Sequence, residues 1–217
     1  MLVLHYTGMK DGPSALARMR DPQTEVSAHY MVEEDGAVHE LVAEEARAWH
    51  AGRSQWQGDD DLNSRSIGIE IVNGGHDFGL PAFPGAQIEA VIALCNEIIA
   101  RRQIPQTRIV GHSDIAPDRK DDPGERFPWR RLAEAGIGLW PEGPVATTPA
   151  PVTERELETA YRTIGYSAVL IDSDIASVTR AFQRRWRQAD VSGEADAETR
   201  RLAVSVAALY SGTCPAR

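Results

Sequence analysis

Apolar residues recur at two different spacings along the first 140 residues of the chain. Five short runs of mainly apolar residues, several with alternation, are predicted to be strands. These runs are Leu2–His5, Ala28–Glu33, Val38–Val42, Ser66–Val72 and Arg108–Val110. Between Gln87 and Arg102 apolar residues return every three or four positions, which predicts a helix with one buried face. A short helix is expected from Pro128 to the residue before Gly136, and strands interleaved with helices predict an α/β layer architecture.

A proline-rich stretch separates this region from a purely helical one. Residues 141–151 contain four prolines and no apolar periodicity, which indicates an extended linker. Three amphipathic helices are expected after it. The first begins with a capping box at Thr153 and Glu156, Asp172 or Ser173 caps the second, and Asp196 caps the third. We therefore predict a sheet-containing domain over residues 1–140 and a small three-helix bundle over residues 152–217.

Composition and charge narrow the classes of partner. The chain has 217 residues and a net charge of −9, and an acidic surface disfavours nucleic acid, whose phosphates it would repel. The sequence contains no apolar stretch of about 20 residues, the length that a membrane-spanning helix needs. Cys95 lies in the predicted helix and Cys214 in the tail, so no disulfide between them is expected. The apolar N-terminus resembles no export signal, so we expect either a cytoplasmic protein or an export segment missing from this sequence.

Two of the six histidines stand at predicted strand ends, where sites in α/β sheets usually form. His5 closes the first run, and His112 follows the last one. The loop after His112 is rich in charge and bounded by prolines; it contains Asp114, Asp118, Lys120, Asp121 and Asp122. Two imidazoles and one carboxylate from these segments would form a zinc site with one open position. A solvated acidic loop with locally bonded histidines fits the spacing as well.

Glu70 lies inside an apolar run. Ile67, Ile69 and Ile71 share one face of the predicted strand, and Glu70 lies on the other face with Gly68. A carboxylate in such a strand is costly unless it is paired or faces a cleft. Glu70 is therefore either on the exposed face of an edge strand or a general base whose pKa is raised by burial.

Several short motifs occur in a characteristic order between His5 and about Trp140. They are Val3–Gly8, Ser27–Tyr30, Ala48–Gly52, Ser66–Glu70, Gly111–Pro117, Arg119–Gly124 and Phe127–Trp129. Together they resemble the type 2 N-acetylmuramoyl-L-alanine amidases, in the branch that contains AmpD and AmiD. The segments Ala181–Trp186 and Gly193–Thr199 resemble the type-1 peptidoglycan-binding domain, and this helical addition makes the AmiD-like members the nearer relatives.

The resemblance implies a fold and a set of roles. The fold is a mixed central β-sheet flanked by helices, followed by the three-helix bundle. His5, His112 and Asp122 would bind one zinc ion, and Asp122 is favoured over its neighbour Asp121. Glu70 would be the general base and Lys120 the cation that faces the oxyanion. A catalytic tyrosine found in other branches is replaced here by Ala28, which places more weight on Glu70.

Further residues are candidates for the substrate groove. Trp49 and His50 could line it, with His50 offering a hydrogen bond near the zinc, although core packing fits Trp49 equally well. Asn73 follows Glu70 closely and could bond the peptide or sugar, and Trp56 could flank the cleft.

The activity that the resemblance implies is hydrolysis of the amide bond between N-acetylmuramic acid, or its 1,6-anhydro form, and L-alanine of the stem peptide. The alternative is a non-catalytic peptidoglycan-recognition protein, which would be expected to lack one or more of the five zinc and catalytic residues. The expected partners are peptidoglycan and muropeptides, and the expected state is a monomer. A wall-binding bundle points to the periplasm or cell envelope, with the cytoplasm as the alternative. The sequence leaves open whether anhydro-muropeptides or intact wall is preferred.

Overall fold

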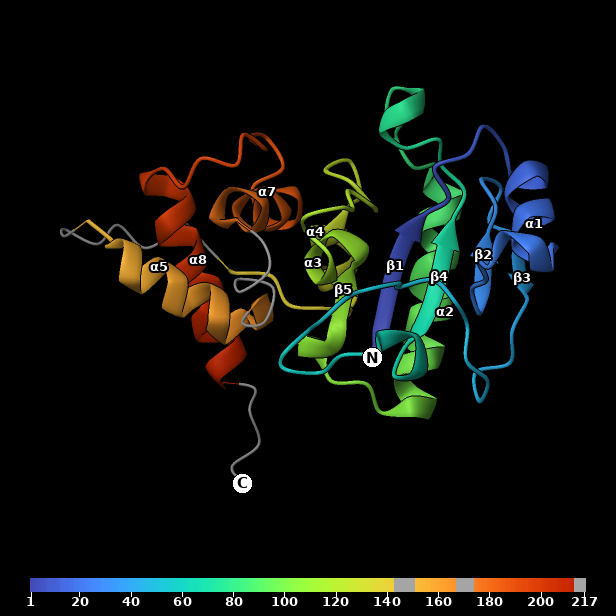
Figure 1. Cartoon of the computed structure of the whole chain (residues 1–217), viewed down its shortest axis with the longest axis horizontal. Coiled ribbons are helices and arrows are strands. Elements are labelled where there is room, and N and C mark those ends of the chain that lie inside the picture. Colours follow the sequence, from blue (N-terminus) through green and yellow to red (C-terminus); the bar gives the residue numbers. More distant parts are fainter. Residues whose placement is uncertain (143–150, 167–173, 213–217) are drawn as a thin grey trace.

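The computed structural model describes residues 1–142, 151–166 and 174–212. Its centre is a five-stranded sheet with the strand order β3-β2-β4-β1-β5 (Figure 1). The strands are β1 Leu2–Tyr6, β2 Tyr30–Val32, β3 Val38–Glu40, β4 Ile67–Ile71 and β5 Ile109–Gly111. β1 pairs in parallel with β4 and β5, β4 pairs in parallel with β2, and β3 alone runs antiparallel. The mixed α/β sheet predicted from the sequence is confirmed.

The two faces of the sheet have different neighbours. Leu2, Leu4 and Ile69 point toward the face covered by α2 (Gly85–Arg102) and α4 (Trp129–Glu134), where they share one apolar cluster with the buried side of α2. The alternate positions of the same strands point to the opposite face. His5 and Glu70 belong to this second face, so the chemistry-bearing side chains lie on the side of the sheet away from α2.

The sequence pattern did not predict two helices of this region. α1 (Gly12–Arg20) buries only Gly12 and Ala15, so it has no apolar stripe that a pattern could reveal; Asp11 caps it. α3 is a single turn, His112–Ile115, in a segment predicted to be a loop. α2 was predicted well, although it begins at Gly85, two residues earlier than expected. Short 3₁₀ turns complete the segment: η1 Pro22–Thr24, η2 Leu62–Ser64, η3 His76–Phe78 and η4 Gln106–Arg108.

The C-terminal region is helical, as predicted. It contains α5 Glu154–Tyr161, the irregular turn η5 Arg162–Tyr166, α7 Ile175–Trp186 and α8 Ala197–Gly212. The capping box at Thr153 and the cap at Asp196 are confirmed. The second cap was predicted wrongly: Asp174 accepts from the backbone N–H of Ser177, one residue beyond Ser173. Asp172 and Ser173 lie outside the described residues, as do Cys214 and linker residues 143–150.

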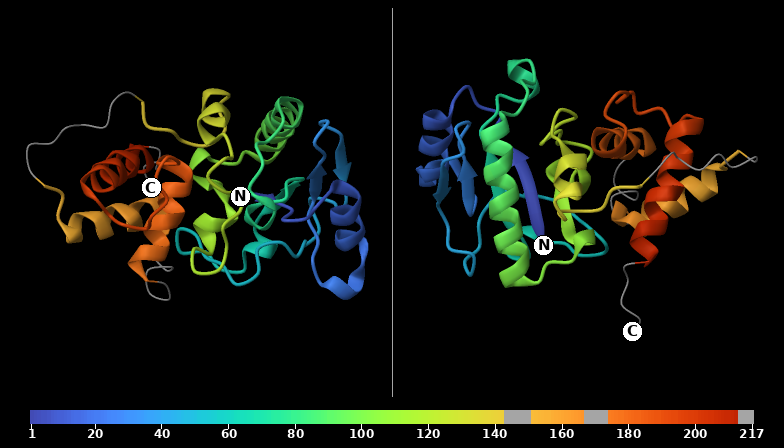
Figure 2. Two further views of the ribbon diagram at one scale, coloured as in Figure 1. Left: turned by 90° about the horizontal axis from the view of Figure 1, so that it is seen from above. Right: turned by 180° about the vertical axis from the view of Figure 1, so that it is seen from behind.

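The C-terminal helices and the sheet share one apolar cluster. Val3, Val110 and Ile115 contribute to it from the first region, and Tyr161 and Phe182 are among its helical members. Figures 1 and 2 show the helices beside the β5 edge of the sheet, with α7 next to α3. Burial of this apolar surface stabilises the contact between the two regions.

Trp56 is part of this contact, and its predicted place beside the cleft was wrong. Its side chain is fully buried, with the ring 5.1 Å from that of Tyr166 and the indole N–H donating to the carbonyl of Thr107. Cys95 is a buried free thiol in α2. Among the described helices, none is both long and apolar enough to cross a membrane.

Candidate metal centre and active site

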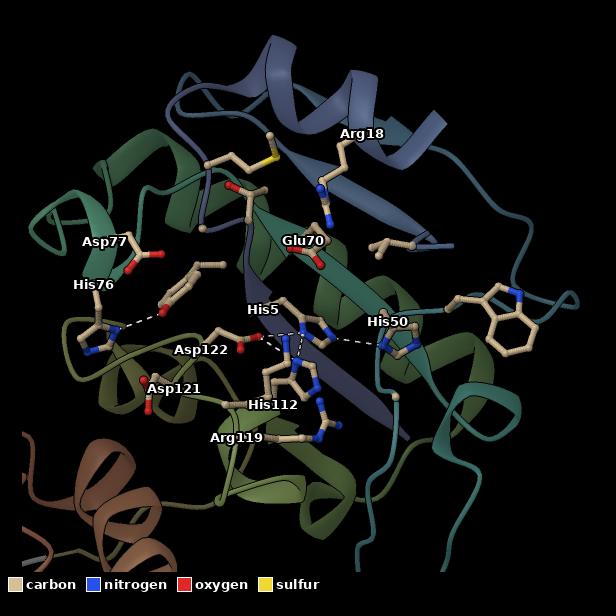
Figure 3. A pocket seen from close by; sticks show the side chains of 18 of the residues that line it. His5, Arg18, His50, Glu70, His76, Asp77, His112, Arg119, Asp121 and Asp122 are labelled. Atoms are coloured by element: carbon tan, nitrogen blue, oxygen red, sulfur yellow. Dashed lines mark hydrogen bonds and ion pairs between the residues drawn. The ribbon is translucent and has the colours of Figure 1, made fainter. Parts of the chain in front are cut away.

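A cleft opens at the carboxyl ends of β1 and β4. Its floor carries His5 from β1, Glu70 from β4, and His112 and Asp122 from the segment that follows β5 (Figure 3). Ends of parallel strands meet at one edge of a sheet, which is why residues more than 100 positions apart converge here.

Three buried side chains converge at the centre of this floor. The Nδ1 atoms of His5 and His112 lie 3.0 Å apart, and Oδ2 of Asp122 lies 2.8 Å from the first and 3.1 Å from the second. The three residues are 1%, 4% and 6% exposed. A tetrahedral zinc site with bonds of about 2.0 Å would place its ligand atoms about 3.3 Å apart, close to this triangle.

Neighbouring groups fix which imidazole nitrogen carries the proton. His112 Nε2 lies 3.0 Å from the carbonyl oxygen of Ala51, which can only accept, so this nitrogen is the donor and Nδ1 keeps its lone pair. His5 Nε2 lies 3.0 Å from Nδ1 of His50 and can donate to it in the same way. Two lone pairs and a carboxylate then face one point, an arrangement that a bound cation relieves. The donor set therefore fits zinc, and the two outer contacts resemble the supporting bonds usual around metal-bound histidines.

Electrostatics keep these groups in the forms that bind metal. Burial, reinforced by the neighbouring His112, lowers the pKa of His5 to about 4, so its imidazole is neutral near pH 7. Burial opposes ionisation of Asp122, but charge and hydrogen-bond interactions with His112 and His5, which act when a ring carries a proton toward the carboxylate, outweigh it and hold the pKa of this carboxyl well below its usual range. Metal ligation needs neutral imidazoles and ionised carboxylates.

Glu70 stands next to this centre on the neighbouring strand. One carboxylate oxygen, Oε2, is buried and has no hydrogen-bond partner among the described residues. Burial, helped by the charge of Asp122, raises the pKa of Glu70 to about 8, while Lys120 opposes the rise. A carboxyl with a raised pKa that faces a cleft is suited to exchanging protons near neutral pH.

Lys120 and the two neighbouring aspartates occupy different places on one loop. Lys120 and Asp122 both line the cleft, but only Asp122 joins the histidines. Asp121 is instead paired with Arg184 of α7. The structure thus groups with the two histidines the carboxylate that the resemblance favours.

The three predicted substrate contacts have distinct environments. Trp49 is 54% exposed at the rim of the cleft, so it is not a core residue, and the guanidinium of Arg47 lies 4.3 Å from its ring centroid. His50 is buried and contacts His5. Asn73 is buried as well: its amide donates to the carbonyl of Pro81 and its side-chain oxygen accepts from Gly75 N–H, so both ends stabilise a turn.

Some cleft residues gave no signal in the sequence. Arg18 projects into the cleft from α1, a helix that the pattern did not predict (Figure 3). Arg119 also lines the cleft and lies below the group of His5, His112 and Asp122 in Figure 3. It donates to the carbonyls of Ala51 and Arg53, which connects the loop after β5 to the segment that carries His50. His76 lies at the rim of the cleft, bonded to Tyr6 and Glu125. Their positions depend on tertiary structure, which spacing alone does not encode.

Comparison with known proteins gives a consistent result. The family described as N-acetylmuramoyl-L-alanine amidase matches residues 1–125. N-acetylmuramoyl-L-alanine amidase AmiD of Escherichia coli is 39% identical over 97% of this chain and 83% of its own length. The 1,6-anhydro-N-acetylmuramyl-L-alanine amidase AmpD of Citrobacter freundii is 42% identical over 49% of this chain and 55% of its own length.

Solved structures agree over nearly the whole chain. E. coli AmiD, in complex with the substrate anhydro-N-acetylmuramic acid-L-Ala-D-γ-Glu-L-Lys, superposes with a TM-score of 0.86 at 38% identity, covering 99% of this chain and 90% of that one. AmpDh3 of Pseudomonas aeruginosa, in complex with an anhydromuramic pentapeptide, gives 0.86 at 35% identity, covering 97% of this chain and 91% of that one. Both matches therefore include the C-terminal helices as well as the sheet.

Proposed function

Because the chain belongs to the N-acetylmuramoyl-L-alanine amidase family, we propose that it hydrolyses the amide bond between N-acetylmuramic acid and L-alanine. We propose that it does so with the help of one zinc ion held by His5, His112 and Asp122. The observation that carries this proposal is the convergence of two imidazole nitrogens and one carboxylate oxygen, all within 4.8 Å of one another, on the floor of the cleft. When bound, zinc polarises a carbonyl oxygen and lowers the pKa of water to about 7.

Glu70 is the proposed general base. Its carboxylate accepts a proton from the water that attacks the lactyl carbonyl of the muramic acid. The same carboxyl then returns the proton to the departing nitrogen of L-alanine. Its raised pKa keeps both directions of transfer accessible near neutral pH. Its place beside His5 in the parallel pairing of β1 and β4 supports this role.

Lys120 is the proposed counter-charge for the carbonyl oxygen. It lines the same cleft as Glu70, and one loop carries it together with Asp122. An ammonium group aimed at an oxygen that gains negative charge stabilises the transition state more than the ground state.

The proposed substrates are muropeptides, including the 1,6-anhydro form, and peptidoglycan itself. AmiD and AmpDh3 were solved with anhydromuramic peptides, and both match this chain over more than nine-tenths of its length. Exposed Trp49 at the rim can pack against a sugar ring, and His50 supports the zinc ligand His5. Because the amide of Asn73 is used within its turn, its proposed contribution is to shape the cleft wall.

We propose the division of the chain into a catalytic region 1–140, a linker 141–151 and a wall-binding region 152–217, in a monomer of the periplasm or cell envelope. The likeness to AmiD across 97% of the chain supports this division, because it includes the helical region. A module that binds wall raises the local concentration of insoluble substrate. Sedimentation with purified sacculi, and fractionation of cells that make the full-length protein, test these two points.

Release of L-alanine-headed peptide from purified muropeptides tests the activity and its metal. Chelator should stop the release and zinc should restore it, in stoichiometric proportion to bound metal. Tight binding of peptidoglycan with no release under any metal condition would instead identify a recognition protein. Full activity after complete removal of metal would refute the zinc site while leaving the amidase intact.

A further inference from the structure

Asp114 is a buried carboxylate that connects the C-terminal helices to the candidate metal centre. Its side chain is 1% exposed and accepts three hydrogen bonds. Oδ2 accepts from the backbone N–H of Gly111 at 2.8 Å and from Nη1 of Arg185 at 2.9 Å. Oδ1 accepts from the hydroxyl of Tyr166 at 2.8 Å. Two of the three donors therefore come from the C-terminal region.

Asp114 closes the turn that presents His112. β5 ends at Gly111, α3 begins at His112, and the bond from Gly111 N–H to Asp114 holds the first turn of α3 together. Because α3 has only four residues, little else in the helix itself fixes the direction of His112. Asp114 thus holds the backbone that carries His112, while the bond from His112 Nε2 to the Ala51 carbonyl orients the ring toward the other two proposed ligands.

The donors from the C-terminal region are themselves held firmly. Arg185 is 2% exposed, and its guanidinium lies 4.3 Å from the ring centroid of Trp129 and 4.6 Å from that of Trp186. Tyr166 is fully buried against Trp56. A buried ion pair is stable only in good geometry, and loss of one partner strands the other charge. The contact therefore holds α3 and α7 in one fixed relation.

A second bond reaches the other end of the same loop. Arg184, the neighbour of Arg185 on α7, pairs with Asp121, which directly precedes Asp122. Two consecutive arginines of α7 thus contact residues that lie one or two positions from two of the three proposed zinc ligands.

We propose that Tyr166 and Arg185 are positioning residues for the metal centre, acting on His112 through Asp114. This inference rests on the proposed zinc site and adds a role for the C-terminal helices apart from binding wall. The helices hold the turn that bears His112, so zinc affinity and turnover on small soluble muropeptides, which need no wall binding, depend on them.

Two tyrosine variants in the full-length protein separate this role from ordinary packing. Tyr166→Phe removes the hydroxyl that donates to Asp114. Tyr161→Phe removes a hydroxyl of an equally buried side chain that, among the described residues, bonds only Thr179 inside the helical region. For each protein we would measure the dissociation constant for Zn²⁺ by competition with a chromogenic chelator, and kcat and KM on a soluble muropeptide.

We expect Tyr166→Phe to weaken Zn²⁺ binding about tenfold, at the lower end of the effect of losing a supporting residue around a metal ligand. kcat should fall with it, whereas Tyr161→Phe should match the wild type in both. Equal zinc affinity and kcat in the two variants would overturn the inference. Failure of the wild type to bind zinc would instead refute the proposed metal site.

A second pair of variants covers the case in which Tyr166→Phe fails to fold. Arg185→Lys keeps the charge but loses the planar two-sided packing, and Arg187→Lys makes the same change at an arginine that pairs with Asp196 and Glu198 within the helical region. Weaker zinc binding in Arg185→Lys alone supports the coupling. The same zinc affinity in both lysine variants contradicts it.

Discussion

Glu70 and His5 are paired residues of neighbouring parallel strands, β4 and β1. Paired residues in a sheet project to the same face, so the carboxylate and the imidazole lie side by side on the face that α2 does not cover. The strand register thus places the proposed base beside the proposed metal ligand without any help from a loop.

Replacement of Glu70 should separate catalysis from metal binding. Glu70→Gln keeps the shape of the side chain and removes its capacity to accept a proton. We expect kcat to fall by roughly 10²–10⁴-fold, the usual contribution of a general base, with zinc binding retained. Turnover of the soluble muropeptide and zinc content measure the two effects. Glu40→Gln, on the exposed edge strand β3, is the matched control and should behave as the wild type; equal activity in both variants would exclude Glu70 as the base.

Removal of metal should cost stability as well as activity. Zinc that binds only the folded protein stabilises it by about 2.7 kcal/mol at a concentration 100 times its Kd. We therefore expect EDTA to lower the Tm and excess Zn²⁺ to restore it, as measured by differential scanning calorimetry. His112→Ala should lose this response, and His39→Ala, at a histidine bonded to Glu33 on the surface, should retain it. A Tm that does not change when EDTA is added would argue against the proposed zinc site.

Regular elements of this chain could be predicted because their signals are local. α2 carries a continuous buried face, and β1 begins with three fully buried apolar residues, Leu2, Val3 and Leu4. α1 lacks such a face, and α3 is a single turn stabilised by Asp114 and its distant partners. A local sequence pattern therefore identifies a helix or strand only where that element carries a continuous apolar face of its own.

The residues of the candidate site were predicted through the resemblance. The contacts between its loop and the C-terminal helices were not predicted. In the sequence, Asp114, Asp121 and Asp122 are equivalent members of one acidic loop. In the structure, one closes the turn of α3, one pairs with Arg184 and one joins the histidines. Arg185 lies 71 positions from Asp114, a separation over which spacing carries no information.

Arg18 should affect substrate affinity rather than turnover. Its guanidinium points into the cleft, and a γ-linked D-glutamate in the stem peptide has a free α-carboxylate that it could pair with (Figure 3). We expect Arg18→Gln to raise KM about fivefold with kcat unchanged, equivalent to about 1 kcal/mol for an exposed ion pair. The effect should weaken at high salt. Lys10→Gln, an exposed charge outside the cleft, serves as the control, and an unchanged KM in Arg18→Gln would exclude the contact.

Glu44 should give the fold a defined dependence on pH. Burial opposes its ionisation, but hydrogen bonds from Arg101, Arg102 and Tyr30 hold the pKa of Glu44 at about 2. Because the folded protein favours the ionised form, this contribution to stability is complete above about pH 4.5, near the unfolded value, and is lost as the pH falls toward 2.

Glu44→Gln should therefore lower the free energy of unfolding at pH 7 by about 2 kcal/mol, the scale of a hydrogen bond to a charged group. The difference in the free energy of unfolding between this variant and the wild type should become smaller at pH 3, as measured by urea denaturation. Glu97→Gln, whose carboxylate is 72% exposed, should show neither effect. A gap that stays constant between pH 7 and pH 3 would mean that the ionised form gains nothing in the folded protein.

Gly68 leaves the space that His50 occupies. A Cβ at this position would lie 2.5 Å from Cγ of His50, so an alanine there must displace the ring. His50 lies 3.0 Å from Nε2 of His5, and displacement would release the outer contact of a proposed zinc ligand. We expect Gly68→Ala to weaken zinc binding on the order of tenfold, as measured by chelator competition. Gly85→Ala adds the same methyl group where nothing lies within 4 Å and should leave zinc affinity unchanged; equal affinity in the two variants would show that the ligand needs no support from His50.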